Sequence, residues 1–252
     1  MRRSTDALIV ALNSDSSNPN IVQEIEELVD KLGDLVTFYK LGIDLLVSEK
    51  FWEILPLLTE KGKKIFLDMK SIEIEEVIRR TVRNAGQLDI KFMTLDGNNS
   101  NKNISAAVRG KLESGNGVKL LALTLLTSID GHDFSEIYGR KAVEIDDFVL
   151  GRAKRLLKAG CDGVIASGRE TKMLREKLSG EIGDFLIVTP GIRRAADSKN
   201  DQKRFVTPTE AILAGSDYLV VGRPITESKD PERAAKEILD EMDEAFDKKS
   251  KN

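Results

Sequence analysis

The 252-residue sequence predicts a single (β/α)₈ barrel that spans residues 1–252. Short apolar runs alternate with amphipathic segments from one end of the chain to the other, which is typical of a parallel sheet with right-handed crossovers. About eight such units are present, the number that closes a barrel. An open doubly wound sheet is the alternative, but it normally has fewer strands and often a glycine-rich first turn, whereas residues 13–19 contain no glycine.

Each unit is predicted from its own periodicity. The apolar runs expected to form strands are 7–13, 35–42, 64–70, 90–97, 119–127, 163–168, 185–191 and 218–223. The first expected helix places Ile21, Ile25 and Val29 on one face, and the later ones follow the same spacing. The expected helices are 20–32, 50–60, 73–85, 104–112, 145–159, 170–177, 209–214 and 231–246.

Composition narrows the function classes. With 40% hydrophobic and 5% aromatic residues, the core is expected to be mostly aliphatic. A net charge of −3 argues against a nucleic-acid or membrane surface. No signal-peptide region or bilayer-length apolar run is present, so we expect a cytoplasmic protein. The single Cys161 excludes an internal disulfide framework and a cysteine-based zinc site, and is expected to be buried.

Charged residues interrupt two apolar runs. Asp68 and Lys70 lie two positions apart at the end of one run, and Lys40 lies at the end of the preceding one. In a strand, residues i and i+2 point to the same face, so Asp68 and Lys70 are expected to project together. Charges at the ends of buried strands are unfavourable unless they are paired or functional. A structural ion pair at one mouth of the barrel is the simpler alternative.

The carboxyl ends of the predicted strands favour a functional site, because active sites of these barrels lie there. The polar or turn residues at those ends are Asn13, Lys40, Asp68, Lys70, Asp96, Thr127, Ser167, Pro190 and Arg223. Gly191 and Gly222 follow the last two strands, where barrels commonly bind phosphate. We predict a phosphate site there, with Arg223 as a charged donor and Gln202 as a neutral one.

In these residues and in the motifs around them, the chain resembles the orotidine 5′-monophosphate decarboxylase family. The resemblance covers nearly the whole chain, in order and with family-like spacing. The matching segments are 39–42 (Tyr-Lys-Leu-Gly), 67–70 (Leu-Asp-Met-Lys), 125–128 (Leu-Leu-Thr-Ser), 188–193 (Val-Thr-Pro-Gly-Ile-Arg), 201–204 (Asp-Gln-x-Arg) and 220–226 (Val-Val-Gly-Arg-Pro-Ile-Thr). Sugar-phosphate decarboxylases of the same superfamily share the Asp-x-Lys, but they usually replace the lysine at position 40 with an acid and bind a metal.

The resemblance implies a cofactor-independent decarboxylation without a metal. Lys70 would donate the proton to C6 of the pyrimidine, Asp68 would face the substrate carboxylate, and Lys40 would neutralise Asp68 and touch the ribose. Glu73 would complete this charged set from the neighbouring subunit of a homodimer. The remaining substrate-binding residues would be Asn13, Asp96, Thr127, Pro190, Gln202, Gly222 and Arg223.

Several positions depart from the family pattern Asp-x-Lys-x-x-Asp-Ile-Pro-x-Thr. Glu73 adds a methylene to the expected aspartate, and Val77 lacks the threonine hydroxyl that contacts the ribose. Asn13 replaces a usual aspartate, and Asp96 replaces a frequent histidine. The one histidine of the chain, His132, is expected in a loop.

Two classes of function remain open from the sequence. The first is a working decarboxylase that converts orotidine 5′-monophosphate to uridine 5′-monophosphate. The second is a non-catalytic or repurposed relative that binds a nucleotide or sugar phosphate on the same barrel, and a different decarboxylation of a smaller sugar phosphate is a further alternative. Retention of Lys40, Asp68 and Lys70 together favours the first, because a binding protein gains little from crowding those charges.

Overall fold

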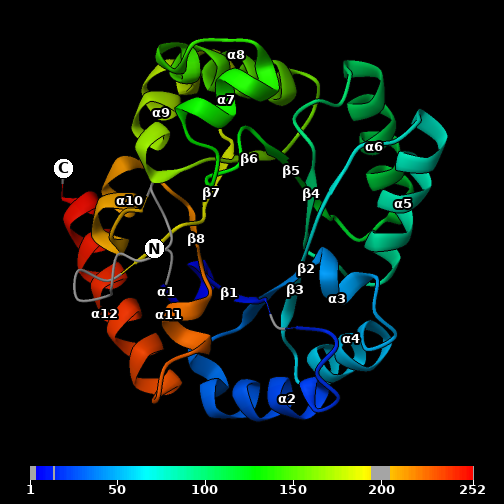
Figure 1. Ribbon diagram of the computed structural model, residues 1–252, viewed down its shortest axis with the longest axis vertical. Coiled ribbons are helices and arrows are strands. Elements are labelled where there is room, and N and C mark those ends of the chain that lie inside the picture. Colours follow the sequence, from blue (N-terminus) through cyan, green and yellow to red (C-terminus); the bar gives the residue numbers. More distant parts are fainter. Residues whose placement is uncertain (1–3, 14, 194–204, 252) are drawn as a thin grey trace.

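Eight parallel strands form a closed ring with helices around it, as the computed structural model in Figure 1 shows. The structure describes residues 4–13, 15–193 and 205–251. Neighbours in the ring follow the chain order, and the last strand pairs with the first. The strands are β1 (Leu8–Leu12), β2 (Phe38–Gly42), β3 (Lys64–Ser71), β4 (Phe92–Leu95), β5 (Lys119–Leu123), β6 (Gly163–Ile165), β7 (Leu186–Thr189) and β8 (Tyr218–Val221). The predicted barrel is confirmed, and each strand falls within or beside its predicted run.

The main helices lie outside this ring. They are α2 (Ile21–Leu32), α4 (Phe51–Glu60), α5 (Glu75–Gln87), α6 (Asn101–Ser114), α8 (Ile145–Lys158), α9 (Gly168–Ile182), α10 (Pro208–Ala214) and α12 (Pro231–Ser250). Each of the eight predicted amphipathic segments corresponds to one of them. The sequence missed the short elements α1 (Ser4–Ala7), η1 (Gly33–Leu35), α3 (Ile43–Leu46), α7 (Gly131–Tyr138), η2 (Ala142–Glu144) and α11 (Arg223–Thr226).

Successive side chains of each strand point alternately outward and inward, so the core has one region outside the ring of strands and one inside it. The larger region, between strands and helices, is mainly aliphatic, as predicted. Inside the ring, a smaller cluster includes the phenylalanines of β2, β3 and β4. The rings of Phe38 and Phe92 lie 4.9 Å apart, and Tyr218 of β8 stands edge-on to both. These three aromatic side chains stand at the starts of their strands and fill the amino-terminal side of the barrel.

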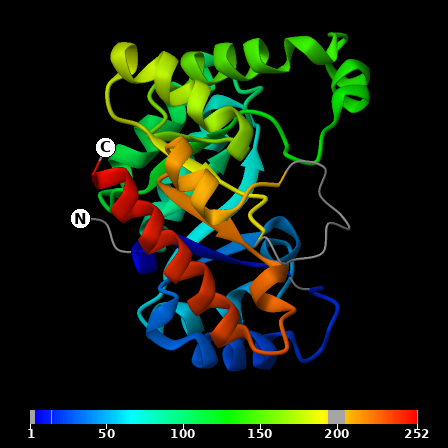
Figure 2. The same ribbon diagram turned by 90° about the vertical axis from the view of Figure 1, so that its left-hand side faces the viewer.

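The first and last helices lie together on the outside of the barrel. Helix α12 runs along the wall, and α1 lies beside it (Figure 2). The backbone N–H of Ser4 in α1 donates to the carboxylate of Asp243 in α12 at 3.2 Å. This contact ties the start of the described chain to its last helix, on the side of the barrel away from the mouth.

Helix α7 corrects one prediction, because His132 lies in its first turn and not in a loop. The side chain of Asp130 accepts hydrogen bonds from the backbone N–H groups of His132 and Asp133, and Asp133 in turn accepts from the N–H of Asp130. This reciprocal cap stabilises a helix start. The pattern Asp130-x-x-Asp133 was therefore the signal that would have predicted the helix.

Candidate active site

A cavity of about 260 Å³ opens at the carboxyl ends of the strands, slightly smaller than the range of about 300–1,000 Å³ that is usual for small-molecule sites. Eight of the residues predicted for the site line it: Asn13, Lys40, Asp68, Lys70, Thr127, Pro190, Gly222 and Arg223. Apolar side chains such as Phe66, Leu126 and Val220 complete its wall. The predicted convergence of polar strand ends at one mouth is present.

The third strand departs from regular geometry at the site. Leu67 pairs with Met93 and Ser71 pairs with Leu95, so three residues of β3 stand opposite one residue of β4. Such a bulge bends a strand and re-aims its side chains. Lys70 has a φ of 50°, in the left-handed region that non-glycine residues rarely occupy. The strain is located at the residue expected to carry the chemistry, as is common for functional sites.

Three charged side chains that line the cavity form a connected array. Lys40 Nζ lies 2.8 Å from Asp68 Oδ2, and Lys70 Nζ lies 2.9 Å from the same oxygen. The Asp68 side chain is 10% exposed, whereas that of Lys70 is 35% exposed. The array therefore buries the carboxylate and leaves one ammonium group facing the open cavity.

Two opposing effects set the protonation of Asp68. Burial by itself would raise the pKa of this carboxyl, because a charge is poorly solvated inside the protein. The adjacent Lys40 and Lys70 ammonium groups outweigh burial, and the pKa of Asp68 lies below its usual value. The carboxylate is consequently charged at neutral pH.

The turn after β4 holds the segment that follows Lys70. The fully buried Asn99 donates its side-chain amide to the Ser71 carbonyl at 2.7 Å, and Asn103 donates in the same way to the Glu73 carbonyl at 2.7 Å. Arg155 of α8 anchors the turn itself through the carbonyls of Gly97 and Asn99. The backbone from Ser71 to Glu73 is thus fixed by side chains from α6 and its preceding turn.

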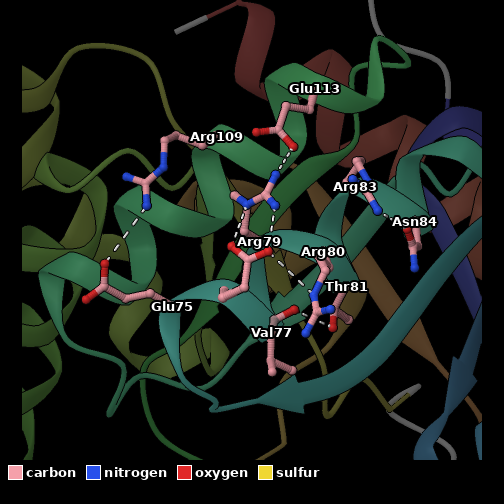
Figure 3. Close-up of polar contacts among 10 residues, drawn as sticks. Glu75, Val77, Arg79, Arg80, Thr81, Arg83, Asn84, Arg109 and Glu113 are labelled. Atoms are coloured by element: carbon pink, nitrogen blue, oxygen red, sulfur yellow. Dashed lines mark hydrogen bonds and ion pairs between the residues drawn. The ribbon is translucent and has the colours of Figure 1, made fainter.

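Helices α5 and α6 follow this segment and the β4 turn outside the barrel, and Figure 3 shows the ion pairs that join them. Arg79 of α5 pairs with Glu76 of its own helix at 2.7 Å and with Glu113 of α6. The backbones approach closely, because a Cβ atom at Gly110 would lie 2.1 Å from the Arg79 carbonyl oxygen. Glycine at position 110 is therefore required by the helix contact.

The predicted phosphate region lies across the cavity from the charged array. Gly191 follows β7 with a φ of 78°, a conformation that glycine adopts without strain. Arg223 begins helix α11 instead of ending β8, and Arg193 joins it in the cavity wall. Among the described residues that line the cavity, four are cationic (Lys40, Lys70, Arg193 and Arg223) and one is anionic (Asp68). This balance favours an anionic ligand.

Other predicted residues lie elsewhere. The Asp96 carboxylate accepts a hydrogen bond from the backbone N–H of Asn98 at 2.7 Å, and the residue does not line the cavity. Glu73 is exposed beyond the cavity rim, where its carboxylate accepts from the N–H of Ile74. Gln202 lies outside the described residues. His132 is also absent from the cavity lining.

Sequence reasoning missed two residues. Arg193 was quoted only as part of a motif, although its place after Gly191 was a usable signal. Thr94 donates its hydroxyl to Asp68 Oδ1 at 2.9 Å, and nothing in the sequence around it distinguishes it from any other strand residue.

Among the described residues, no cluster of three His, Cys, Asp or Glu side chains is suited to hold a metal ion. In the same part of the chain, no helix has the length and apolar content needed to cross a bilayer.

A model of the orotidine 5′-phosphate decarboxylase / HUMPS family matches residues 6–238. The chain belongs to this family. It is 42% identical over 226 residues to an orotidine 5′-phosphate decarboxylase of Nitrobacter winogradskyi, covering 89% of this chain and 90% of the relative. It is also 42% identical over 237 residues to one of Ruegeria pomeroyi, covering 94% of each chain.

A solved structure agrees with this assignment. The crystal structure of orotidine 5′-phosphate decarboxylase from Lactobacillus acidophilus is 34% identical, with a TM-score of 0.76, and the match covers 94% of this chain and 98% of that one. Membership in the decarboxylase family agrees with the resemblance found in the motifs. The departures at Glu73 and Val77 lie outside the charged array of Lys40, Asp68 and Lys70.

Proposed function

We propose that this protein is an enzyme that decarboxylates orotidine 5′-monophosphate to uridine 5′-monophosphate, a step of pyrimidine nucleotide synthesis. The observation that carries the proposal is the Lys40–Asp68–Lys70 array in a cationic cavity. The curated relatives reported above are named as decarboxylases of this substrate, and they match this chain over most of its length.

The reaction breaks the bond between C6 of the pyrimidine and its carboxylate carbon, and the electron pair stays on C6 while carbon dioxide leaves. The Lys70 ammonium group stabilises this developing carbanion and then delivers a proton to C6. Asp68 holds Lys70 in place, and its charge repels the substrate carboxylate until carbon dioxide departs. Lys70 regains its proton from solvent.

The rest of the nucleotide binds along the cavity wall. Thr127 hydrogen-bonds the pyrimidine ring, Lys40 and Asn13 contact the ribose, and Arg223 binds the 5′-phosphate beside Gly222. Gln202 contributes a neutral donor to the same phosphate. Contacts with the phosphate are remote from C6, and their binding energy helps to position the ring for reaction.

We also propose that the protein is a homodimer across the mouth of the barrel. An apolar rim lies next to the array on the β2 and β3 side, where Ile43, Val47, Ile72 and Ile74 are 54–80% exposed. Exposed apolar patches of this kind mark interaction surfaces. Glu73 lies between two of these residues, so a second copy seated on the rim brings a carboxylate toward a cavity that carries excess positive charge.

The function is tested by following the ultraviolet absorbance of orotidine 5′-monophosphate with purified protein. We expect the absorbance to change to that of uridine 5′-monophosphate, with release of one carbon dioxide per nucleotide. A protein that binds uridine 5′-monophosphate but leaves orotidine 5′-monophosphate unchanged would contradict the proposal. Light scattering at micromolar concentration tests the dimer separately, and a monomer there counts against it.

A further inference from the structure

One buried hydroxyl contacts the charged array from outside the cavity. Thr94 is the single residue of β4 that stands opposite Asp68, Met69 and Lys70 in the β3 bulge. Its side chain is fully buried, and its Oγ1 lies 2.9 Å from Asp68 Oδ1. Thr94 does not line the cavity, so any effect it has on a ligand passes through Asp68.

With this contact, both oxygens of the Asp68 carboxylate have a donor. Oδ2 of Asp68 accepts both ammonium groups, at 2.8 Å from Lys40 and 2.9 Å from Lys70, while Oδ1 faces Thr94. The terminal torsion of an aspartate has a broad, shallow minimum, so it does not fix the plane of the carboxylate by itself. A donor on Oδ1 opposite two cations on Oδ2 fixes that plane.

We propose that Thr94 is a positioning residue for the decarboxylation, because its hydroxyl orients the Asp68 carboxylate and thereby holds the Lys70 ammonium group at the point of proton delivery. This inference rests on the proposed function. Lys70 is the more exposed of the two lysines and its backbone is strained, so its ammonium group depends on Asp68 for its place. A displacement of about 1 Å at a reacting centre is enough to slow catalysis about 100-fold.

The positioning role is tested by comparing Thr94→Val with Thr94→Ser. Valine keeps the shape and removes the hydroxyl, whereas serine keeps the hydroxyl. We expect Thr94→Val to lower kcat by about 10- to 100-fold, the size of one hydrogen bond to a charged group, with KM changed by less than about threefold. Thr94→Ser should restore kcat to within about threefold of the unmutated protein.

Thr124→Val is the matched control. Thr124 is also a buried threonine, just after the neighbouring strand β5, and its hydroxyl donates to the Ile165 carbonyl at 2.9 Å. That carbonyl also accepts the backbone N–H of Thr124, so it stays bonded in the variant. This substitution should leave kcat unchanged. Equal losses of kcat in the two valine variants, or full activity of Thr94→Val, would overturn the positioning role.

A second measurement does not depend on activity. Carbon-13 NMR of the Asp68 carboxyl follows its titration, with Lys40 of β2, Lys70 of β3 and Thr94 of β4 as the groups that face it. Loss of a donor to the charged form should raise the Asp68 pKa in Thr94→Val, and an unchanged pKa would overturn the proposal. If the unmutated protein fails to decarboxylate the substrate, the proposed function falls, and this titration still decides whether Thr94 acts on the Asp68 carboxylate. Thr94→Ala provides the same readout if the valine variant does not fold.

Discussion

Lys70 combines the two unusual properties of the site at the scale of a single residue. Its backbone is held in the left-handed region at a φ of 50°, and its ammonium group lies 2.9 Å from a buried carboxylate. A left-handed non-glycine residue costs about 1–3 kcal/mol and persists only where its surroundings impose it. The Ser71 carbonyl, held by Asn99, and the Asp68 carboxylate provide those surroundings.

Lys70→Ala should abolish decarboxylation and leave the affinity for uridine 5′-monophosphate within about threefold. The interaction of the ammonium group with C6 exists mainly in the transition state, so its loss appears in kcat and not in ground-state binding. The absorbance assay and calorimetric titration measure the two quantities. Lys172→Ala, at a 74% exposed side chain on α9, is the control and should behave like the unmutated protein.

Arg223 and Gln202 should contribute unequally to phosphate binding. Loss of a charged bidentate donor from a buried partner costs about 2–5 kcal/mol, whereas a neutral hydrogen bond contributes about 0.5–1.5 kcal/mol. Titration should therefore find uridine 5′-monophosphate weakened far more by Arg223→Ala than by Gln202→Ala. Equal affinities of the unmutated protein for uridine and its monophosphate would exclude the phosphate site.

Helices α5 and α6 approach each other closely outside the barrel. Helix α6 carries Asn103, which holds the Glu73 carbonyl after β3. The exposed ion pairs of Arg79 between and within the two helices add little on their own. The close approach at Gly110 is more restrictive, because it is a contact between backbones. The helix pair is therefore expected to resist any larger side chain there.

Gly110→Ala should destabilise the protein by about 1–3 kcal/mol, the usual range for overpacking, although alanine is the better helix former by about 1 kcal/mol. Its Cβ atom would lie 2.1 Å from the Arg79 carbonyl oxygen. Gly180→Ala in α9 is the matched control, because nothing lies within 4 Å of its Cβ position, and it should stabilise the protein slightly. Urea unfolding measures both, and a neutral Gly110→Ala would show that the helices can separate without loss.

At the scale of the whole molecule, the site formed by a single chain gives no role to the side chain of Glu73. Its side chain is exposed beyond the rim, while its backbone carbonyl is held by Asn103. An exposed carboxylate on a fixed backbone, flanked by exposed Ile72 and Ile74, fits a role in the site of a second copy. The longer side chain of glutamate would then reach across the interface from a fixed base.

Mixing two variants with impaired catalysis tests this arrangement. Lys70→Ala removes the proton donor, and Glu73→Ala should lower kcat about tenfold or more if the carboxylate completes the array. In a mixed dimer, one site contains an intact Lys70 from one chain and an intact Glu73 from the other. Random exchange of an equal mixture makes half of the dimers mixed, so activity should rise on mixing to about a quarter of the specific activity of the unmutated dimer. No recovery in dimers shown to have exchanged would place Glu73 in its own subunit's site.

The sequence by itself determined the barrel, the strands that compose it and most residues of the cavity. These features follow from local signals: apolar periodicity specifies each strand and helix, and the motifs around Lys40, Asp68 and Arg223 stand at strand ends that parallel pairing brings to one mouth. The short helix α7 is specified in the same way by the capping residues at its start. Local patterns were sufficient wherever one residue's neighbours in sequence decide its geometry.

Only the tertiary structure decided which of these residues meet and how. The β3 bulge arises from the register between two strands, and the contact from Thr94 to Asp68 joins residues 26 positions apart. Asp96 stands at a strand end as predicted, but its carboxylate accepts a hydrogen bond from the backbone N–H of Asn98 and does not line the cavity. The physical reason is common to these cases: strand registers and hydrogen-bond partners are selected by competition among groups distant in sequence, and that competition is resolved only when the barrel closes.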